Sequence, residues 1–381
     1  MRILQLWTLY DGYLDAFYKA RPGLASATYA QQREAVLDDG FGWPPAVGRR
    51  LAERGHDVEI VIGNCEPMQR AWAREANAAF AERDWLTSVP AEQLRRFRPD
   101  VLWIGSEFQY FGRFLRSVRQ HCGSVVAWTA APLPVALDLG SIDCMVTSHV
   151  GFQETFRRRG VRCERMLPCF EPRMLESVGD LGRDVPVSFV GGLTWAHIDR
   201  VHALCRVAEV QDLEIWSTSP PLLTRSALRP AFWRAWLAAR PLRAGRHPAV
   251  FGEDMYRVLG RSVMTINVHA GVAGGLAGNM RMFEATGMGA LLLTEDMPNL
   301  SGLFEPGVEV VAYRDPDDLC AKIRYYSERP AEARATAASG QRRTLRDYNT
   351  SVRAGEIEAL FADLRGAASR TTRRSVESAT A

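Results

Sequence analysis

Residues 279–296 read Asn279-Met-Arg281-Met-Phe-Glu284-Ala-Thr-Gly287-Met-Gly289-Ala-Leu-Leu-Leu-Thr-Glu295-Asp296. The short polar pair Gly278-Asn279 opens a helix, and Gly287 and Gly289 end it. The apolar residues 290–293 that follow predict a buried parallel strand. A helix that leads directly into such a strand is typical of α/β proteins.

Arg281 and Glu284 lie in the first turns of this predicted helix. The amides of a helix N-terminus and an arginine suit a phosphate, and a carboxylate one turn further can accept hydrogen bonds from sugar hydroxyls. The pair therefore favours a sugar-phosphate site. The alternative is an ordinary helix with a solvent-exposed arginine and glutamate.

The chain has 381 residues, 47% of them hydrophobic, which is enough for two or three domains. The formal net charge of +3 gives no indication of nucleic-acid binding. Lys19 and Lys322 are the only lysines. A phosphate site in the second half must therefore use arginine or backbone amides.

Seven cysteines form no C-x-x-C pair, which favours small buried side chains in a reducing compartment. The chain begins directly with a strand-like run, so we expect no signal peptide. No apolar run approaches membrane-spanning length. These features predict a cytoplasmic protein without a transmembrane segment.

Strand-like apolar runs alternate with helical patterns, which predicts an α/β fold with parallel sheets covered by helices. The strands are expected near 3–7, 58–62, 101–104, 125–128, 145–147, 165–167, 187–190, 213–216, 264–268, 290–293 and 308–312. A polar, glycine-containing break at 177–184 separates the two halves. Residues 366–381 have no periodicity and are predicted to be a disordered tail.

Several separated motifs carry a family resemblance. The run 279–295, with Asn299-Leu300, Phe304-Glu-Pro-Gly307 and Tyr313-Arg-Asp315, resembles the C-terminal signature of GT-B glycosyltransferases. Within these it is most similar to the CgeB-like branch of the group 1 (family 4-like) enzymes. Further matches are Asp39-Gly-Phe-Gly-Trp43, Asn64-Cys-Glu-Pro-Met-Gln-Arg-Ala-Trp72, Ser188-Phe-Val-Gly-Gly192 and residues 342–353. The resemblance covers residues 1 to about 360.

The resemblance implies two Rossmann-like domains whose parallel sheets face each other across a cleft. Residues 1–178 would be the acceptor domain and 185–348 the nucleotide-sugar domain, with 349–365 forming a helix that crosses back to the first domain. It also implies a hexosyl- or deoxyhexosyltransferase of polysaccharide biosynthesis. This enzyme would transfer sugar from a nucleotide-diphosphate donor to a hydroxyl of a glycan or another glycosylated molecule, without a cofactor.

Glu284 matches the second of two glutamates that stand eight positions apart in family-4-like enzymes, where it binds the ribose hydroxyls. The first position holds Leu276 here, so the carboxylate that would face the donor sugar is missing. The glutamate motif favours a retaining reaction, but the missing partner weakens that inference. The sequence leaves the donor nucleotide, the sugar, the acceptor and the oligomeric state open.

The donor-binding candidates lie at predicted strand ends. They are Gly191, Gly192, His197, Arg200, Asn267, His269, Asn279, Arg281 and Glu284. Glycines after a strand let backbone amides approach a diphosphate, and His197 or Arg200 could add charge-assisted donors. A tight turn with an exposed arginine, and a structural role for His269, are the alternatives.

Asp315-Pro-Asp317 has the spacing of a metal-binding D-x-D motif. It stands at the start of a predicted helix, where a carboxylate caps the helix and proline suits the first turn. No other cluster has ligand spacing, so we predict a metal-independent site. Arginines and the helix dipole would then stabilise the departing diphosphate.

In the first half, Asp11, Glu107 and His149 follow predicted strands and are candidates for the general base of an inverting reaction. The acceptor-binding candidates are Tyr13, Asp39, Trp43 and Glu107. Each carboxylate could instead be a capping or loop residue, and Trp43 could belong to the core.

Two other functions stay open. A sugar-nucleotide epimerase shares the fold, and a catalytically silent spore or surface-layer protein is the alternative outside enzymes. The chain has no G-x-G-x-x-G after its first strand, no P-loop and no G-x-S-x-G, which disfavours dehydrogenases, P-loop ATPases and α/β-hydrolases.

Overall fold

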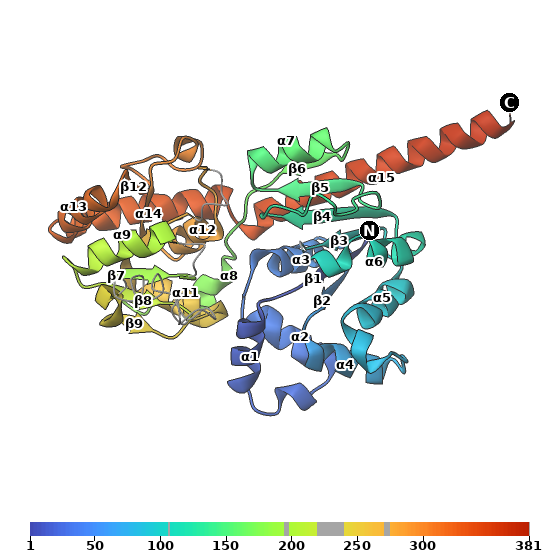
Figure 1. Ribbon diagram of the computed structural model, residues 1–381, viewed down its shortest axis with the longest axis horizontal. Helices are drawn as coiled ribbons and strands as arrows, with labels where there is room; N and C mark the ends of the chain where they lie inside the picture. Colours follow the sequence, from blue (N-terminus) through green and yellow to red (C-terminus); the bar gives the residue numbers. More distant parts are fainter. Residues whose placement is uncertain (106, 194–197, 219–239, 270–274, 381) are drawn as a thin grey trace, which may run out of the picture. The chain divides into compact units, whose positions relative to one another are not determined.

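A computed structural model describes residues 1–380 except 106, 194–197, 219–239 and 270–274. The chain forms two compact units: Met1–Leu167 with Thr350–Ala381 is unit 1, and Pro168–Asn349 is unit 2 (Figure 1). Each unit contains a six-stranded sheet in which all strand pairs are parallel. The predicted α/β fold class with two parallel sheets is confirmed.

The sheet of unit 1 has the order β2-β1-β3-β4-β5-β6. Its strands are β1 (Arg2–Trp7), β2 (Asp57–Ile62), β3 (Val101–Ile104), β4 (Ser124–Thr129), β5 (Cys144–Thr147) and β6 (Cys163–Arg165). The strand expected near 165–167 begins two residues earlier than predicted, at Cys163. The other predicted strands of this half are present.

Helices cover both faces of this sheet. They are α1 (Asp11–Lys19), η1 (Leu24–Ser26), α2 (Tyr29–Asp38), α3 (Trp43–Glu53), α4 (Glu66–Glu75), η2 (Glu82–Asp84), α5 (Trp85–Phe97), η3 (Phe108–Tyr110), α6 (Arg113–Val118), η4 (Arg119–His121), α7 (Val150–Arg158) and α15 (Thr350–Thr380). Leu102 on β3 shares a hydrophobic core with Leu94 of α5 and Leu115 of α6. The neighbouring Trp103 points the other way and lies edge-on to Phe361 of α15. Successive side chains of β3 therefore pack into the hydrophobic layers on the two faces of the sheet.

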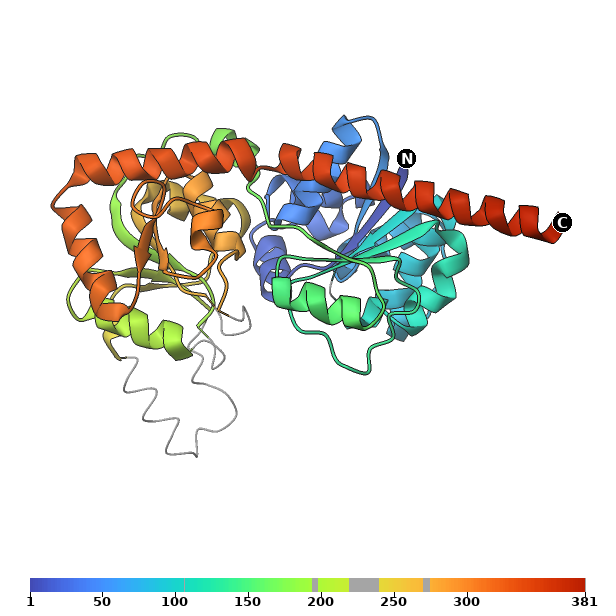
Figure 2. The ribbon, with the colours of Figure 1, turned by 90° about the horizontal axis from the view of Figure 1, so that it is seen from above.

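Helix α15 packs on α3 and β4 of unit 1. The tail predicted to be disordered at 366–381 is instead part of this helix, which continues to Thr380 (Figure 2). After Gly366 the sequence contains no glycine or proline that would end a helix.

The sheet of unit 2 has the order β12-β11-β10-β7-β8-β9. Its strands are β7 (Val185–Val190), β8 (Glu214–Trp216), β9 (Arg246–His247), β10 (Ser262–Asn267), β11 (Leu291–Glu295) and β12 (Val311–Tyr313). β9 was not predicted, because two residues carry no periodicity.

Helices also cover both faces of the second sheet. They are α8 (Arg173–Val178), α9 (Ile198–Ala208), η7 (Arg240–Arg243), α11 (Gly252–Arg261), α12 (Met280–Gly287), η9 (Leu300–Gly302), α13 (Pro316–Ser327) and α14 (Pro330–Asp347). Leu204 of α9 and Ile323 of α13 share a core with Ile266 and Leu293 of the central strands. Helices α11 and α12 contact β10 on the other side. Gly289, with φ of +74°, follows the end of α12 as the sequence predicts.

The boundary expected at 178–185 falls at 167–168 in the structure. Helix α8 packs on α11 and so belongs to unit 2. The backbone of Phe170 donates to the carbonyl of Tyr348, 2.8 Å away. Within the predicted break, Arg183 donates to the carbonyl of Met288 at 2.7 Å. The polar segment 177–184 is therefore the end of α8 followed by a loop, and it is anchored inside unit 2. None of the described helices combines the length and apolar character needed to cross a membrane.

Candidate functional site

The candidate site lies at the carboxyl edge of the unit 2 sheet. Parallel strands all end at this edge, and ligands of open α/β sheets bind there. Gly191 follows β7, Val268 follows β10, and Asn279 precedes the first turn of α12. The sequence-predicted donor residues that the structure describes are therefore brought to one edge of one sheet.

Arg281 lies in the first turn of α12 and is largely buried. Its Nε donates to the carbonyl oxygen of Val190 at 3.1 Å, which ties α12 to the end of β7. One terminal nitrogen lies 2.7 Å from a carboxylate oxygen of Glu284 and 3.0 Å from Met255 Sδ. Among the described residues the second terminal nitrogen makes no hydrogen bond. A fixed guanidinium with an uncommitted end can bind an anion.

Arg200 on α9 is the second arginine of this edge. Its guanidinium donates to the Gly192 carbonyl at 2.7 Å and to the Val268 carbonyl at 2.7 and 3.2 Å. Burial, and then the positive charge of Arg281, lower the pKa of Arg200 to about 10. Two arginines close enough to repel each other would both gain from a bound anion.

Glu284 lies beneath the surface, with 4% of the residue exposed. Burial raises the pKa of its carboxyl, and Arg281 opposes that rise. Burial first, and then the negative charge of Glu284, raise the pKa of the neighbouring Tyr256 well above its ordinary value. In this structure the carboxylate of Glu284 positions Arg281. The predicted contact with ribose hydroxyls stays a prediction.

A polar network joins the ends of β10 and β11. Oε2 of Glu295 accepts from the backbone N–H of His269 at 2.6 Å and lies 3.0 Å from its Nδ1. Nδ2 of Asn267 donates to Thr294 Oγ1 at 3.0 Å, and its Oδ1 accepts from Nδ2 of Asn279 at 2.7 Å. These bonds fix the side chains of three predicted donor residues, Asn267, His269 and Asn279.

Glu295 was not among the predicted site residues. Its signal in the sequence was its place as the final residue of an apolar strand, where a polar side chain reaches the carboxyl edge. Because a carboxylate only accepts, the facing Nδ1 of His269 carries the proton, and Nε2 is left as an acceptor. Glu295 therefore selects the tautomer of His269.

The loop that precedes α12 is held by Asn299, a residue of the motif that resembles glycosyltransferases. Its Oδ1 accepts from the backbone N–H of Ala277 at 2.7 Å, and its Nδ2 donates to the Ala277 carbonyl at 2.9 Å. This bidentate contact fixes the chain one residue after Leu276. The start of α12 is therefore oriented by both a side-chain clamp and Arg281.

The Gly191-Gly192 turn connects β7 to the candidate site. The N–H of Gly191 donates to the Trp216 carbonyl at 3.1 Å, so only Gly192 keeps its amide outside the sheet ladder. A side chain at position 191 would come within 3.1 Å of the Phe189 ring. His197, predicted to lie on the same turn, is outside the described residues.

The candidate bases of unit 1 also follow strand ends. Asp11 is exposed at the start of α1 and accepts from Asn64 Nδ2 at 3.0 Å. Glu107 is exposed after β3, and the half-buried His149 precedes α7, edge-on to Phe152. In the sheet, β1 and β3 are neighbours, whereas β4 separates β3 from β5. Asp11 and Glu107 thus lie after adjacent strands, and His149 after a more distant one.

Two aromatic acceptor candidates are core residues. Tyr13 is 2% exposed, and its ring stacks on Phe41 at 4.2 Å. Trp43 is 4% exposed and lies edge-on to Trp128 at 4.9 Å. Stacking on a sugar requires an accessible ring face, so the structure does not support that role for Tyr13 or Trp43. The sequence pattern could not show that these rings turn inward.

Asp39, another acceptor candidate, is buried and accepts from a terminal nitrogen of Arg21 at 3.1 Å. Burial, and then the Asp39 carboxylate, raise the pKa of Tyr13. Arg21 in turn lies over the ring of Phe17, 3.8 Å from its centroid. In this structure Asp39 fixes the α1–α3 segment, which is a structural contact.

The metal-like motif is a helix cap. Oδ1 of Asp315 accepts from the backbone N–H of Asp318 at 2.8 Å, which confirms the capping interpretation. Asp317 points to Arg206, 2.7 Å from its Nε. Across the described part of the chain, no three His, Cys, Asp or Glu side chains are grouped to hold a metal ion.

Two parallel α/β units with a polar carboxyl edge are the architecture of GT-B proteins, and comparison with solved structures supports that class. Sucrose-phosphate synthase from Thermosynechococcus elongatus is 12% identical with a TM-score of 0.59, and the match covers 96% of this chain and 100% of that one. HepE from Anabaena, solved with UDP and glucose, is 11% identical with a TM-score of 0.58 and coverages of 95% and 100%. AviGT4, a glycosyltransferase of avilamycin A biosynthesis, is 16% identical with a TM-score of 0.53 and coverages of 96% and 98%.

The chain therefore has the GT-B fold. Residues 200–359, which hold the candidate donor site, match the family model described as glycosyl transferase-like. The predicted resemblance to GT-B glycosyltransferases is thus confirmed. None of the curated proteins searched matches the chain.

Proposed function

We propose that the protein is a glycosyltransferase that moves a sugar from a nucleotide-diphosphate donor to a hydroxyl of a glycan or another glycosylated acceptor. The observation that carries this proposal is a pair of arginines at the carboxyl edge of the unit 2 sheet, Arg281 in the first turn of α12 and Arg200 on α9. The family match of residues 200–359 supports the same reaction class.

The chemistry follows from the charge that develops on the leaving group. When the bond between the sugar and the diphosphate breaks, negative charge builds up on the diphosphate oxygens. Arg281, held by Val190 and Glu284, presents its remaining nitrogen without needing to reorganise. The amides of the first turn of α12 add their dipole in the same direction. These groups supply the stabilisation that a metal supplies elsewhere, so we propose a metal-independent reaction.

The acceptor is proposed to bind unit 1, with its hydroxyl near the ends of β1 and β3. Asp11 and Glu107 are exposed there and follow adjacent strands. For an inverting reaction, one of these two would take the proton of the hydroxyl. His149 follows a strand further along the sheet and is the third candidate.

Nucleotide binding tests the proposal first. Calorimetric titration of the full chain with UDP, GDP, dTDP and CMP should show one preferred nucleotide. UDP is the first to test, because HepE was solved with UDP-glucose. Arg200→Met should weaken this binding. Arg206→Met is the matched control, since Arg206 lies on the same helix but pairs with Asp317.

Turnover is the second test. Incubation of the preferred nucleotide-sugar with and without glycan acceptors should release the nucleotide and form a glycoside, in buffer containing EDTA. Conversion of the donor into an epimeric nucleotide-sugar without acceptor would instead identify an epimerase. No measurable affinity for any of the four nucleotides would contradict the proposal and favour a catalytically silent surface protein.

A further inference from the structure

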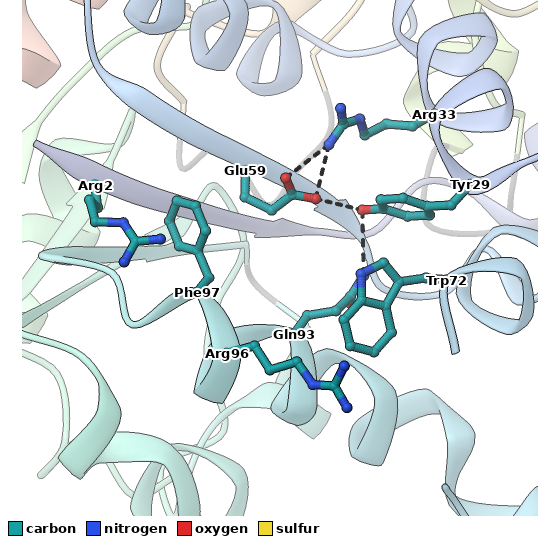
Figure 3. Close-up of a pocket in the computed structure, with 8 residues that line it drawn as sticks. All are labelled: Arg2, Tyr29, Arg33, Glu59, Trp72, Gln93, Arg96 and Phe97. Atoms are coloured by element: carbon teal, nitrogen blue, oxygen red, sulfur yellow. Dashed lines mark hydrogen bonds and ion pairs between the residues drawn. The ribbon is translucent and has the colours of Figure 1, made fainter. Parts of the chain in front are cut away.

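A cavity of about 450 Å³ opens on unit 1 among α2, α4, α5 and the first two strands (Figure 3). Arg2, the first residue of β1, and Glu59, in the first half of β2, line it. The cavity therefore lies toward the amino ends of the strands. Asp11 and Glu107, the proposed acceptor-side residues, follow the opposite ends. None of the residues to which the proposed reaction assigns a role lines this cavity.

One wall of the cavity is a chain of hydrogen bonds that runs from Arg33 through Glu59 and Tyr29 to Gln93. A terminal nitrogen of Arg33 donates to both carboxylate oxygens of Glu59 at 2.9 Å. The hydroxyl of Tyr29 donates to Glu59 at 2.8 Å and accepts from Nε2 of Gln93 at 3.4 Å (Figure 3). Because the charges of Arg33 and Glu59 balance, this wall is neutral and its side chains are fixed.

Gln93 lies at the end of this network, and the carbonyl oxygen of its side chain lacks a hydrogen-bond donor among the described residues. Its amide nitrogen is committed to Tyr29, which leaves Oε1 as the free end of the amide. The residue is 3% exposed, and Oε1 has no hydrogen-bond partner among the described residues. A buried carbonyl oxygen normally accepts a hydrogen bond. Gln93 lines the cavity, and because Oε1 itself is buried, a hydroxyl donor bound there would supply this bond once the amide turns toward the cavity.

The rest of the lining carries aromatic rings and arginines. The guanidinium of Arg96 lies 5.4 Å from the centroid of Trp72, and that of Arg2 lies 4.4 Å from the centroid of Phe97. Nε of Arg2 donates to Oδ2 of Asp57 at 3.0 Å. Among the described residues the terminal nitrogens of Arg2 make no hydrogen bond. The lining thus joins apolar ring faces to guanidinium groups that can bind an anion.

From this combination we propose that the cavity binds an acidic saccharide unit, such as a uronic acid residue of the acceptor glycan. A pyranose has an apolar C–H face for Trp72 or Phe97, and its hydroxyl can donate to Gln93 Oε1. Its carboxylate matches the guanidinium groups of Arg2 and Arg96. The volume lies within the range of about 300–1,000 Å³ that small-molecule sites occupy. As a part of the acceptor, this ligand rests on the proposed function.

Ligand-observed NMR and calorimetry on the full chain test the proposal, with methyl β-D-glucuronide and methyl β-D-glucoside as probes. The glucuronide should bind, and the neutral glucoside should bind about tenfold more weakly or not at all, because it lacks the charge-assisted bonds. UDP should not compete with the glucuronide. An absence of glucuronide binding, equal binding of both glycosides, or displacement by UDP would each overturn the proposal.

Two neighbouring arginines of α5 give a matched pair of variants. Arg95 and Arg96 both bind Glu92 and have 42% and 46% of their side chains exposed, but only Arg96 lines the cavity. Arg96→Ala should weaken glucuronide binding about tenfold, and Arg95→Ala should leave it unchanged. Equal losses in both variants would contradict the assignment.

Gln93→Leu tests the hydroxyl contact, with its thermal melting followed to verify that the chain is folded. Arg281→Lys tests whether glucuronide binding is independent of the donor site, and it should leave the affinity for the glucuronide unchanged. If nucleotide binding fails while the glucuronide still binds and depends on Arg96, the proposed function falls and the saccharide site stands. If nucleotides bind and the glucuronide does not, only the saccharide site falls.

Discussion

Replacement of Arg281 is the sharpest test of the donor site. With the part of the chain that the structure describes, its guanidinium makes three polar contacts: Nε to the Val190 carbonyl at 3.1 Å, and one terminal nitrogen to Glu284 at 2.7 Å and to Met255 Sδ at 3.0 Å. These contacts use three of its five N–H groups. The two that remain belong to one terminal nitrogen, which is the group proposed to meet the diphosphate.

The expected size of the effect follows from this geometry. Loss of one preorganised donor to a developing negative charge lowers kcat by about 10²–10³-fold. Arg281→Ala also leaves the buried Glu284 without its partner, and truncation of a buried ion pair costs about 3–5 kcal/mol of folding free energy. Arg281→Lys keeps a positive charge beside Glu284 but loses both the Val190 contact and the planar fork. The lysine variant should therefore fold normally, retain donor binding and turn over at least about tenfold more slowly, whereas the alanine variant should lose about 10²-fold in kcat.

The assay is steady-state release of nucleotide at saturating donor, with UDP affinity from calorimetry and melting temperature as controls. Arg206→Lys, a substitution on the surface of α9, should change none of the three quantities. We expect kcat to fall more than donor affinity, because the leaving diphosphate gains charge only as the bond breaks. A folded Arg281→Ala variant that turns over like wild type would refute it and move the phosphate site toward Arg200 and the residues preceding α9.

Three further outcomes are expected. Glu284→Ala should weaken nucleotide binding by about 1.5–3 kcal/mol in calorimetry, the range for hydrogen bonds to charged groups; unchanged affinity in a folded variant would remove Glu284 from the site. Asp317→Ala, and EDTA added to wild type, should leave turnover nearly unchanged, whereas activity restored by Mn²⁺ or Mg²⁺ after EDTA would show that a metal is required. Hydrogen bonds from Arg54 and His56 lower the pKa of Glu358, so its contribution to the stability of unit 1 is present above its ordinary pKa of 4.5 and is lost as pH falls below that value. Glu358→Gln should lower the free energy of unfolding by about 0.5–1 kcal/mol at pH 7 and by less at pH 3, and an equal loss at both pH values would contradict the electrostatic assignment.

The central elements of both sheets could be predicted from the sequence because their signals are local. Residues 279–296 carry a helix start, two helix-ending glycines and a continuous apolar strand, and the structure shows α12 followed by β11 there. The donor candidates could be assigned to the carboxyl edge for the same reason. Residues that directly follow parallel strands all lie at that edge of the sheet. The capping role of Asp315 was predictable for the same reason.

Features that depend on packing could not be predicted in this way. Whether Trp43 faces solvent or Trp128 depends on a strand more than eighty positions away, and the sequence pattern of α3 does not show it. The contact of Glu295 with His269 likewise joins the ends of two strands that only the sheet order makes neighbours. Gln93 could not be recognised as a cavity residue, because its helix reads as an ordinary surface helix until Tyr29 and Glu59 are placed beside it.

The charges at the carboxyl edge of the unit 2 sheet show what the replacement of a family glutamate by Leu276 changes. Leu276 stands where a glutamate would face the donor sugar, and the two carboxylates nearby are already engaged: Glu284 with Arg281, and Glu295 with His269. Among the described residues, Arg200 donates only to carbonyl oxygens, and its pKa is lowered by burial and by Arg281. Without the glutamate, this edge is more positive than the family pattern implies. For the proposed donor, such an edge would favour the diphosphate over the sugar, so we expect recognition of the sugar to depend more on hydrogen bonds from backbone and amide groups than on a carboxylate.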